Sequence, residues 1–222
     1  MAKILLVRHG ETDWNREQRL QGHLDIGLNE RGIEQARLLG KILAHEKIDA
    51  AYSSDLSRAL DTALAIVAHH QLPVSQDQSL RERHYGEIQG MTYGEIEQHR
   101  PENHNAWQGR NADFRPKDGE SLREFYDRVV TGASRIAGAH LGQKIVIVAH
   151  GGVLDCLYRA ATNLPIEAPR TFGLLNTSLN RLNFDGEKFS LESWGDVSHL
   201  DDPNAEDEMD GQGKLSVPWS LP

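Results

Sequence analysis

A run of apolar, mostly β-branched residues at Lys144–Ala149 (KIVIVA) constrains the fold more than any other segment of the chain. Because the run has no polar face, it fits a strand that is buried on both sides of a sheet. A second apolar run, at residues 3–7, begins the chain, and segments with helical periodicity lie between the two. Alternating strands and helices are typical of α/β proteins. We therefore expect a three-layer α/β/α sandwich around a mostly parallel central sheet.

Periodicity and turn residues place most of the other elements. Asn29 is expected to cap a helix. The buried face of this helix carries residues at steps of three and four, namely Ile33, Ala36, Leu39 (or Gly40) and Leu43. Ser121 and Glu124 have the spacing of a capping box and open a long helix that reaches residue 140. The remaining expected elements are strands at 49–54 and from 73, and helices at 56–69, 92–99 (stopped before Pro101) and 153–161.

The C-terminal part of the chain predicts a hairpin followed by a tail. Asp185-Gly186 separates two strand-like segments, 179–184 and 187–194, which makes the sheet mixed rather than wholly parallel. No repeat or linker interrupts residues 1–195, so we expect one domain there. Residues 196–222 hold seven acidic residues and one lysine, and we expect them to form an acidic tail.

Charge and cysteine content exclude several classes of protein. The formal net charge of the 222 residues is −9, which argues against a nucleic-acid-binding protein. Six of these nine negative charges fall in residues 196–222, so the rest of the chain is nearly neutral. Cys156 is the only cysteine, which excludes an intrachain disulfide. No apolar run has the roughly 20 residues of a membrane span. We expect a cytoplasmic protein, monomeric or homodimeric.

Two of the predicted buried strands end in a histidine followed by glycine. His9 follows the first strand and His150 follows the strand at Lys144–Ala149. In α/β sheets, sites form beyond the carboxyl ends of strands, so neighbouring strands would bring the two rings together. A single histidine at a strand end is more often structural, but two of them with Arg8 beside one favour a site. Arg58, in the first turn of a predicted helix, would add a second guanidinium suited to a tetrahedral dianion.

These segments resemble the histidine phosphatase superfamily, also called the phosphoglycerate mutase-like family. The resemblance covers about residues 3–185 and rests on motifs that occur in the family's order. They are Leu6–Asn15 (LVRHGETDWN), Gln21-Gly22, Leu28–Gly32 (LNERG), Ser53–Arg58 (SSDLSR), Leu80–Gly86 (LRERHYG), Gly119-Glu120-Ser121 and Val148–Gly152 (VAHGG).

The resemblance implies a role for each matching residue. His9 would be the nucleophile that becomes phosphohistidine, and Glu82 would give a proton to the leaving oxygen. The phosphoryl group would be held by Arg8, Arg58 and His150. The residues implied to line the phosphate and substrate sides are Asn15, Gln21, Gly22, Arg83, His84, Tyr85 and Gly151. The substrate would be a small phosphorylated metabolite, and the resemblance implies no metal or other cofactor.

The chemistry of these side chains agrees with the roles that the resemblance implies. A nucleophilic imidazole must be neutral, and two nearby arginines disfavour its protonation. The other ring nitrogen of His9 needs an acceptor, most simply the carbonyl of Gly10. Two arginines and a second histidine can neutralise the equatorial oxygens of the phosphoryl group. A proton from Glu82 would make the alkoxide a competent leaving group.

The sequence leaves three functions open, of which a phosphomonoesterase is the first choice. The second is a cofactor-dependent phosphoglycerate mutase, and the third is a catalytically silent module that binds a phosphorylated ligand. Glycolytic mutases resemble this chain up to Gly90, but Tyr93 replaces a lysine and Trp107 begins a segment that lacks their arginines. We expect a second anionic group of the substrate to be contacted by Arg110, Arg115 or Lys117. Either Thr177 or Ser178 is a further, weaker candidate for ligand contact.

Overall fold

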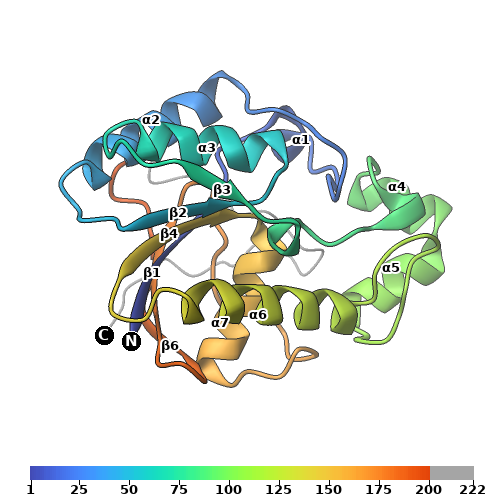
Figure 1. The fold of residues 1–222 in the computed structure, drawn as a ribbon. Coiled ribbons are helices and arrows are strands. Elements are labelled where there is room, and N and C mark those ends of the chain that lie inside the picture. The colour runs from blue at the N-terminus through green and yellow to red at the C-terminus, as the bar shows by residue number, and fades with distance from the viewer. Residues whose placement is uncertain (201–222) are drawn as a thin grey trace.

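Within residues 1–200, which the computed structural model describes, six strands form one mixed sheet (Figure 1). Their order across the sheet is β3-β2-β4-β1-β5-β6. The first four strands in this order are parallel to one another. β5 runs antiparallel to both of its neighbours, β1 and β6. The strands are β1 (Ala2–Arg8), β2 (Ala50–Ser53), β3 (Val74–Gln76), β4 (Lys144–Ala149), β5 (Leu179–Phe184) and β6 (Phe189–Asp196). The predicted sandwich with a mostly parallel, mixed sheet is confirmed.

Helices cover both faces of the sheet, and the central strands supply apolar residues to each side alternately. In the view of Figure 1, α2 (Glu30–Leu43) and α3 (Ser57–Val67) lie above the sheet. Below it lie α6 (Leu122–Gly138) and α7 (Gly151–Thr162). Side chains on a strand alternate between faces, so Val146 packs in one core and Ile147 in the other. β4 is therefore buried on both sides, as its composition predicts.

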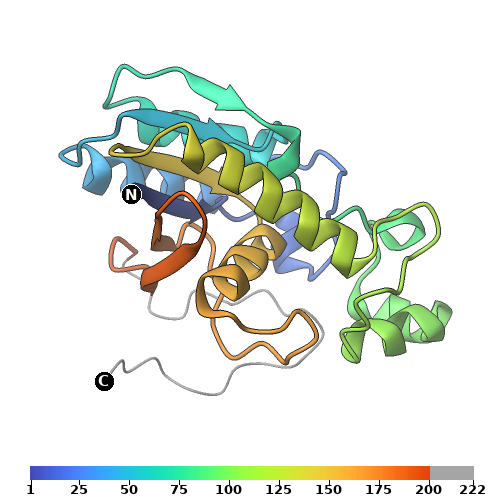
Figure 2. The same cartoon turned by 60° about the horizontal axis from the view of Figure 1, so that its bottom comes forward.

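A third, smaller group of elements lies beyond the end of the sheet. Figure 2 shows α4 (Tyr93–His99) and α5 (Pro101–Gln108), drawn in green, projecting from the sandwich. They pack on a separate apolar cluster that includes Leu20, Tyr85 and Ile88. The short elements that complete this end are α1 (Asp13–Arg16), η1 (Gln78–Leu80) and η2 (Gly86–Ile88). Side chains from α1, α4 and α5 line part of the pocket described below.

The structure confirms two helix caps and one hairpin turn that the sequence predicts. The Asn29 side chain accepts a hydrogen bond from the Gly32 amide and begins α2. Ser121 and Glu124 form the predicted capping box of α6, with each side chain bound to the other residue's amide. Gly186 has a φ of 116° in the turn of the predicted hairpin, a conformation that favours glycine.

One feature of the predicted helices is wrong, namely the burial of Ile33. Ile33 is 59% exposed, because α2 approaches the main chain so closely that a Cβ on Gly32 would lie 2.1 Å from the Glu11 carbonyl oxygen. This contact directs Gly32, and not Ile33, toward the protein. The helix predicted at 92–99 is confirmed as α4, which ends before Pro101. A further short helix, α5, then begins at Pro101, since proline fits the first position of a helix, where no amide donor is needed.

The described part of the chain contains no helix that is long and apolar enough to cross a membrane.

At the C-terminal end of the described residues, β6 extends to Asp196, and the His199 ring then contacts the Thr177 hydroxyl at 3.1 Å. Most of the predicted acidic tail, residues 201–222, lies outside the described residues.

The unequal burial of α2 side chains predicts unequal costs of truncation. Leu39 is fully buried, so Leu39→Ala should lower the free energy of unfolding by about 2–5 kcal/mol, the range for deleting a buried leucine side chain. Ile33→Ala, on the same helix, should change it by less than about 0.5 kcal/mol. Urea denaturation of both variants measures the difference. Equal losses at the two positions would contradict the orientation of α2.

Candidate active site

Parallel pairing of β1 with β4 brings the two strand-end histidines together. Arg8 lies opposite Ala149 in the register of these strands, so His9 and His150 emerge at the same point. The ring centroids are 5.2 Å apart. Both residues are buried, and the His9 amide donates to the Ala149 carbonyl at 2.9 Å. The predicted juxtaposition of the two histidines therefore follows directly from the sheet.

The hydrogen bond to Gly10 determines the tautomer of His9. Nδ1 of His9 lies 2.7 Å from the Gly10 carbonyl oxygen, as expected from the sequence. Because a carbonyl can only accept, Nδ1 carries the hydrogen and donates it. In the neutral ring, Nε2 then holds the available lone pair. His9 lines the pocket and is thus oriented as a nitrogen nucleophile.

Burial and nearby arginines keep both histidines neutral. Burial lowers the pKa of His9 well below its usual value, Arg58 and then Arg8 lower it further, and the bond to Gly10 opposes this. The pKa of His150 is also lowered, first by burial and then by Arg58, His9 and Arg8. The ring nitrogens of His150 have no hydrogen-bond partner within residues 1–200. This arrangement suits a site that acquires its hydrogen bonds from an anionic ligand.

The two arginines are fixed by main-chain carbonyls. Arg8 is fully buried at the end of β1 and donates through Nη1 to the Leu174 carbonyl. Arg58, in the first turn of α3, donates to the carbonyls of Leu24 and Gly22 at 2.9 and 2.8 Å. These bonds restrict each guanidinium to one orientation, so two positive charges face the same histidines with little conformational freedom.

Glu82 lies in the segment between η1 and η2, and main-chain amides hold its carboxylate. Oε1 accepts from the Arg83 amide at 2.7 Å, and Oε2 accepts from the Gly152 amide, near the start of α7, at 2.9 Å. A Cβ on Gly152 would lie 2.2 Å from Oε1, so glycine is required for this approach. The acid is therefore fixed beside the same strand end that carries His150.

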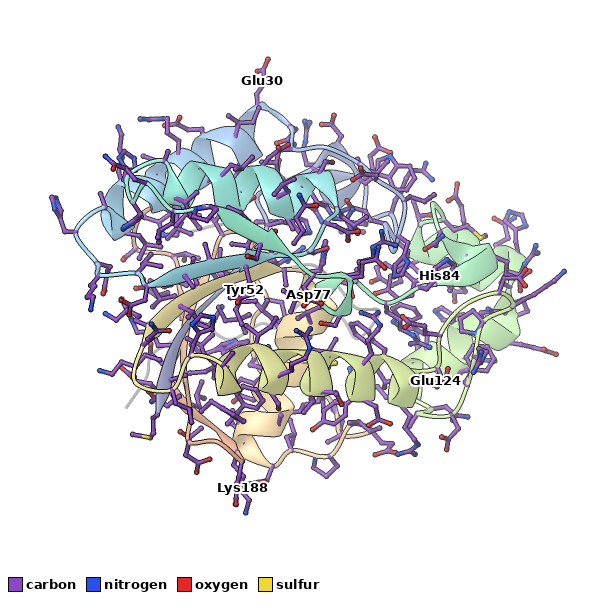
Figure 3. All side chains as sticks on the ribbon, viewed as in Figure 1. Glu30, Tyr52, Asp77, His84, Glu124 and Lys188 are labelled. Atoms are coloured by element: carbon purple, nitrogen blue, oxygen red, sulfur yellow. The ribbon has the colours of Figure 1, made fainter. Side chains whose placement is uncertain are left out.

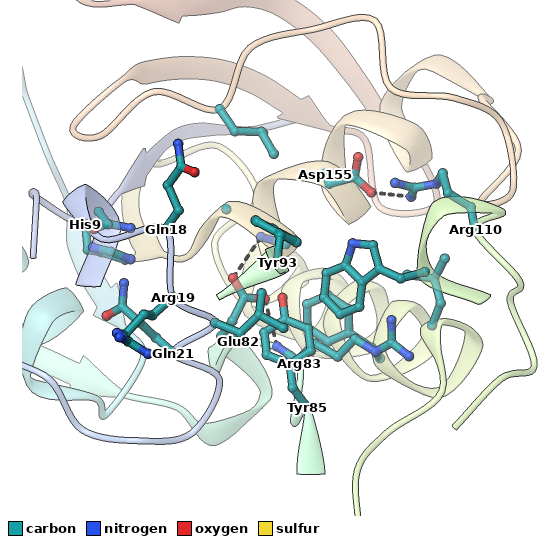
Figure 4. A pocket seen from close by; sticks show the side chains of 18 of the residues that line it. His9, Gln18, Arg19, Gln21, Glu82, Arg83, Tyr85, Tyr93, Arg110 and Asp155 are labelled. Atoms are coloured by element: carbon teal, nitrogen blue, oxygen red, sulfur yellow. Dashed lines mark hydrogen bonds and ion pairs between the residues drawn. The ribbon is translucent and has the colours of Figure 1, made fainter. Parts of the chain in front are cut away.

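His9, Arg58 and Glu82 border one pocket (Figure 4). In that view His9 and Gln21 lie at one end, Glu82 lies in the middle, and Arg110 with Asp155 lies at the other end. The predicted site residues that line the pocket are His9, Asn15, Gln21, Arg58, Glu82, Arg83, Tyr85 and Gly151. Within residues 1–200, no group of three or more His, Cys, Asp or Glu side chains is arranged to hold a metal ion.

Four predicted residues lie outside the pocket wall. Arg8 and His150 have no exposed surface, and neither borders the pocket. Gly22 contributes its carbonyl to Arg58 rather than a surface to the pocket. His84 makes an edge contact with His23, with ring centroids 4.6 Å apart. Arg8 and His150 are placed to act on a bound group through the charge of that group. Gly22 and His84 hold neighbouring segments.

Comparison with known proteins agrees with this geometry. The model of the histidine phosphatase superfamily (branch 1) matches residues 4–197. The chain belongs to this superfamily. Phosphoglycerate mutase-like protein 4 of Arabidopsis thaliana is 46% identical over 205 residues, which are 90% of this chain and 88% of that protein. The metal-independent phosphoserine phosphatase of the same plant is 39% identical over 203 residues, which are 90% and 84% of the two chains.

Among solved structures, YhfR of Bacillus stearothermophilus superposes with a TM-score of 0.82 at 35% identity. The superposition covers 90% of this chain and 99% of that one. The fold and the family implied by the sequence motifs are therefore confirmed for this histidine phosphatase.

Several pocket residues of this histidine phosphatase were not found from its sequence. Leu20, Tyr93, Trp107, Phe114, Phe125 and Leu174 form apolar surface, and Asn176 donates to the His9 carbonyl at 2.9 Å. The weaker candidate Thr177 instead donates its amide to the Arg8 carbonyl. The sequence points to the adjacent Thr177 and Ser178, and only the tertiary contacts distinguish Asn176 from these neighbours.

The three basic candidates for a second anionic group are not equivalent. Arg110 lines the pocket, where it donates to Asp155 at 2.9 Å and to the Ile166 carbonyl at 3.0 Å. Arg115 forms an ion pair with Glu124 away from the pocket, and Lys117 is absent from the pocket wall. Arg115 and Lys117 were therefore wrong as candidates, because the loop that carries them turns outward.

The electrostatic account predicts how the pKa of His9 responds to Arg58. Removing this positive charge in Arg58→Gln should raise the pKa of His9, although burial, the larger cause, should still hold it below 6.5. The ring resonances of His9, followed by NMR against pH, measure the change. Arg58→Lys retains the charge and should leave the titration near that of the wild type. An identical His9 pKa in wild type and Arg58→Gln would contradict this account.

Proposed function

We propose that the protein is a metal-independent phosphomonoesterase that acts through a phosphohistidine on His9. The observation that carries the proposal is a neutral His9, whose Nδ1 is bound to Gly10 and which shares one pocket with Arg58 and Glu82, while Arg8 and His150 lie close to it. Each of these groups has a separate task in transferring a phosphoryl group from an oxygen to a nitrogen and then to water.

In the first step, Nε2 of His9 attacks phosphorus as the bond to the ester oxygen breaks. Protonated Glu82 transfers its proton to that oxygen, and the alcohol leaves. General acid catalysis of this kind contributes about 10²–10⁴-fold to the rate. Arg8, Arg58 and His150 stabilise the charge on the equatorial oxygens. Asn15, Gln21 and the Gly151 amide are proposed to complete the binding of the phosphoryl group.

In the second step, the carboxylate of Glu82 accepts a proton from water as the water attacks phosphorus. The bond between phosphorus and Nε2 breaks, His9 returns to its neutral form, and inorganic phosphate leaves. Glu82 ends the cycle protonated, so no other proton donor is needed. The two amides that hold Glu82 keep its carboxylate near the reacting oxygen in both steps.

The pocket beyond Glu82 supports hydrolysis of a small phosphorylated metabolite. Tyr93, which stands where glycolytic mutases have a lysine, lines it, and so does Trp107, which begins the segment that lacks their arginines. A phosphoglycerate mutase is the second candidate, favoured by the 46% identity to a mutase-like relative.

We further propose that the protein is cytoplasmic and is a monomer or homodimer. The cytoplasmic location fits a chain whose single cysteine, Cys156, is a buried free thiol.

Turnover assays distinguish these functions. The purified protein should release phosphate from aryl and alkyl phosphates, and EDTA should not reduce the rate. His9→Ala should reduce turnover by at least about 10³-fold, because a covalent route loses its nucleophile. Rapid isomerisation of 3-phosphoglycerate with 2,3-bisphosphoglycerate, without phosphate release, would establish the mutase instead. Binding of phosphate esters without either reaction would indicate the silent module.

The far end of the pocket predicts a preference for substrates with a second anionic group. Arg110 and Arg159 share the carboxylate of Asp155, so these three side chains carry one net positive charge. Arg110→Gln should raise KM for 3-phosphoglycerate about tenfold, since a charge-assisted hydrogen bond is worth about 1.5–3 kcal/mol. KM for glycerol phosphate, which lacks the carboxylate, should not change.

Arg115→Gln is the matched control for this experiment, because Arg115 pairs with Glu124 outside the pocket. It should leave KM for both substrates unchanged. If Arg110→Gln changes KM for both substrates equally, the far end of the pocket does not select an anionic group.

A further inference from the structure

The segment that carries Glu82 has little regular structure of its own. Residues 81–85 connect η1 to η2, and neither of these short elements belongs to the sheet. In Figure 3, Asp77, which precedes η1, lies beside α6, where its carboxylate pairs with Arg135. A catalytic acid needs a fixed position relative to the ester oxygen, and an irregular segment does not provide one by itself. Contacts from neighbouring elements restrain this segment instead.

Arg128, on α6, binds main-chain carbonyls of Glu82 and of residues that precede it. Nη1 of Arg128 donates to the carbonyls of Ser79 and Arg81 at 3.0 and 3.1 Å, and Nη2 donates to the Glu82 carbonyl at 3.1 Å. A planar guanidinium presents its donors in a fixed geometry, so one side chain fixes the direction of these three carbonyls. The Glu82 carbonyl is also bound by Nε2 of His23 at 2.8 Å.

Glu120 restrains the same segment on the C-terminal side of Glu82. Its carboxylate accepts from the His84 amide at 2.8 Å, and its own amide donates to the His84 carbonyl at 2.8 Å. Its carbonyl accepts from Nε of Arg83 at 3.0 Å. Arg128 donates to both carboxylate oxygens of Glu120, each at 2.8 Å. The two residues thus join the contacts on both sides of Glu82 into one unit.

We propose that Arg128 and Glu120 are positioning residues that hold Glu82 in place as the proton donor. Neither residue lines the pocket, so they act through Glu82 and not on the substrate. The inference rests on the proposed phosphohistidine mechanism, in which Glu82 protonates the leaving oxygen. Its consequence is specific: loss of either residue impairs the reaction in proportion to how much the leaving group needs a proton.

The dependence on the leaving group separates positioning of Glu82 from general loss of structure. An alkoxide needs a proton to leave, whereas p-nitrophenolate leaves without one. Arg128→Lys retains the charge but loses the fork of donors, so kcat/KM for glycerol phosphate should fall about 10²-fold, while that for p-nitrophenyl phosphate should fall less than about threefold. The ratio of the two values does not depend on the fraction of folded enzyme. Glu120→Gln should lower the same ratio, and it provides a second variant if Arg128→Lys folds poorly.

A double-mutant cycle with Glu82→Gln tests whether Arg128 acts through Glu82. In the Glu82→Gln enzyme the acid is already lost, so adding Arg128→Lys should not lower kcat/KM for glycerol phosphate further. Arg135→Gln is the control, because Arg135 is on the same helix and pairs with Asp77 at the surface. It should leave the ratio of the two substrates unchanged.

The outcomes distinguish this inference from the proposed function. Equal losses for both substrates in Arg128→Lys and Glu120→Gln, or effects of Arg128→Lys and Glu82→Gln that simply add, would overturn the positioning role. If His9→Ala instead keeps wild-type turnover of both substrates, the phosphohistidine mechanism fails, whatever Arg128 does.

Discussion

The parallel hydrogen-bonded pairing of β1 with β4 is the constraint on which the site depends. It fixes the relative position of two strand ends, and each end supplies one histidine at the same edge of the sheet. Apolar packing on both faces makes this pairing costly to shift, because a slip by one residue would exchange the buried sides of both strands. The rest of the site, including Arg58 and Glu82, is arranged around these two rings.

Around that fixed pair, the site gathers the positive charges of two buried arginines. Burial alone favours the neutral form of both histidines, and Arg8 and Arg58 act in the same direction. The same arginines offer a dianion the partners that it needs, which explains how a chain with a net charge of −9 can have a phosphate site. Glu82 reaches the site from an irregular segment, so its position depends on restraints contributed by α6 and residue 120.

The sequence predicts those parts of the structure that depend on local signals or on one strong repeat. The β4 run, the caps at Asn29 and Ser121, and the strand-end histidines fall in this class. Tertiary packing decides the rest: the close approach at Gly32 turns Ile33 outward, and α5, which begins at Pro101, is not among the helices expected from the sequence. The aromatic pocket wall and Asn176 come from segments whose side chains acquire a direction only when the elements beyond the sheet pack together.

Trapping the phosphorylated enzyme tests the central claim most directly. Glu82→Gln should slow attack of water on the phosphohistidine, so brief reaction of this variant with p-nitrophenyl phosphate followed by alkaline quenching should accumulate it. Mass spectrometry of the digested protein should then find one phosphoryl group on the peptide that contains His9, and none in the His9→Ala, Glu82→Gln double variant. Phosphate release by the wild type with no phosphorylated His9 peptide, or with the label on another residue, would contradict the account.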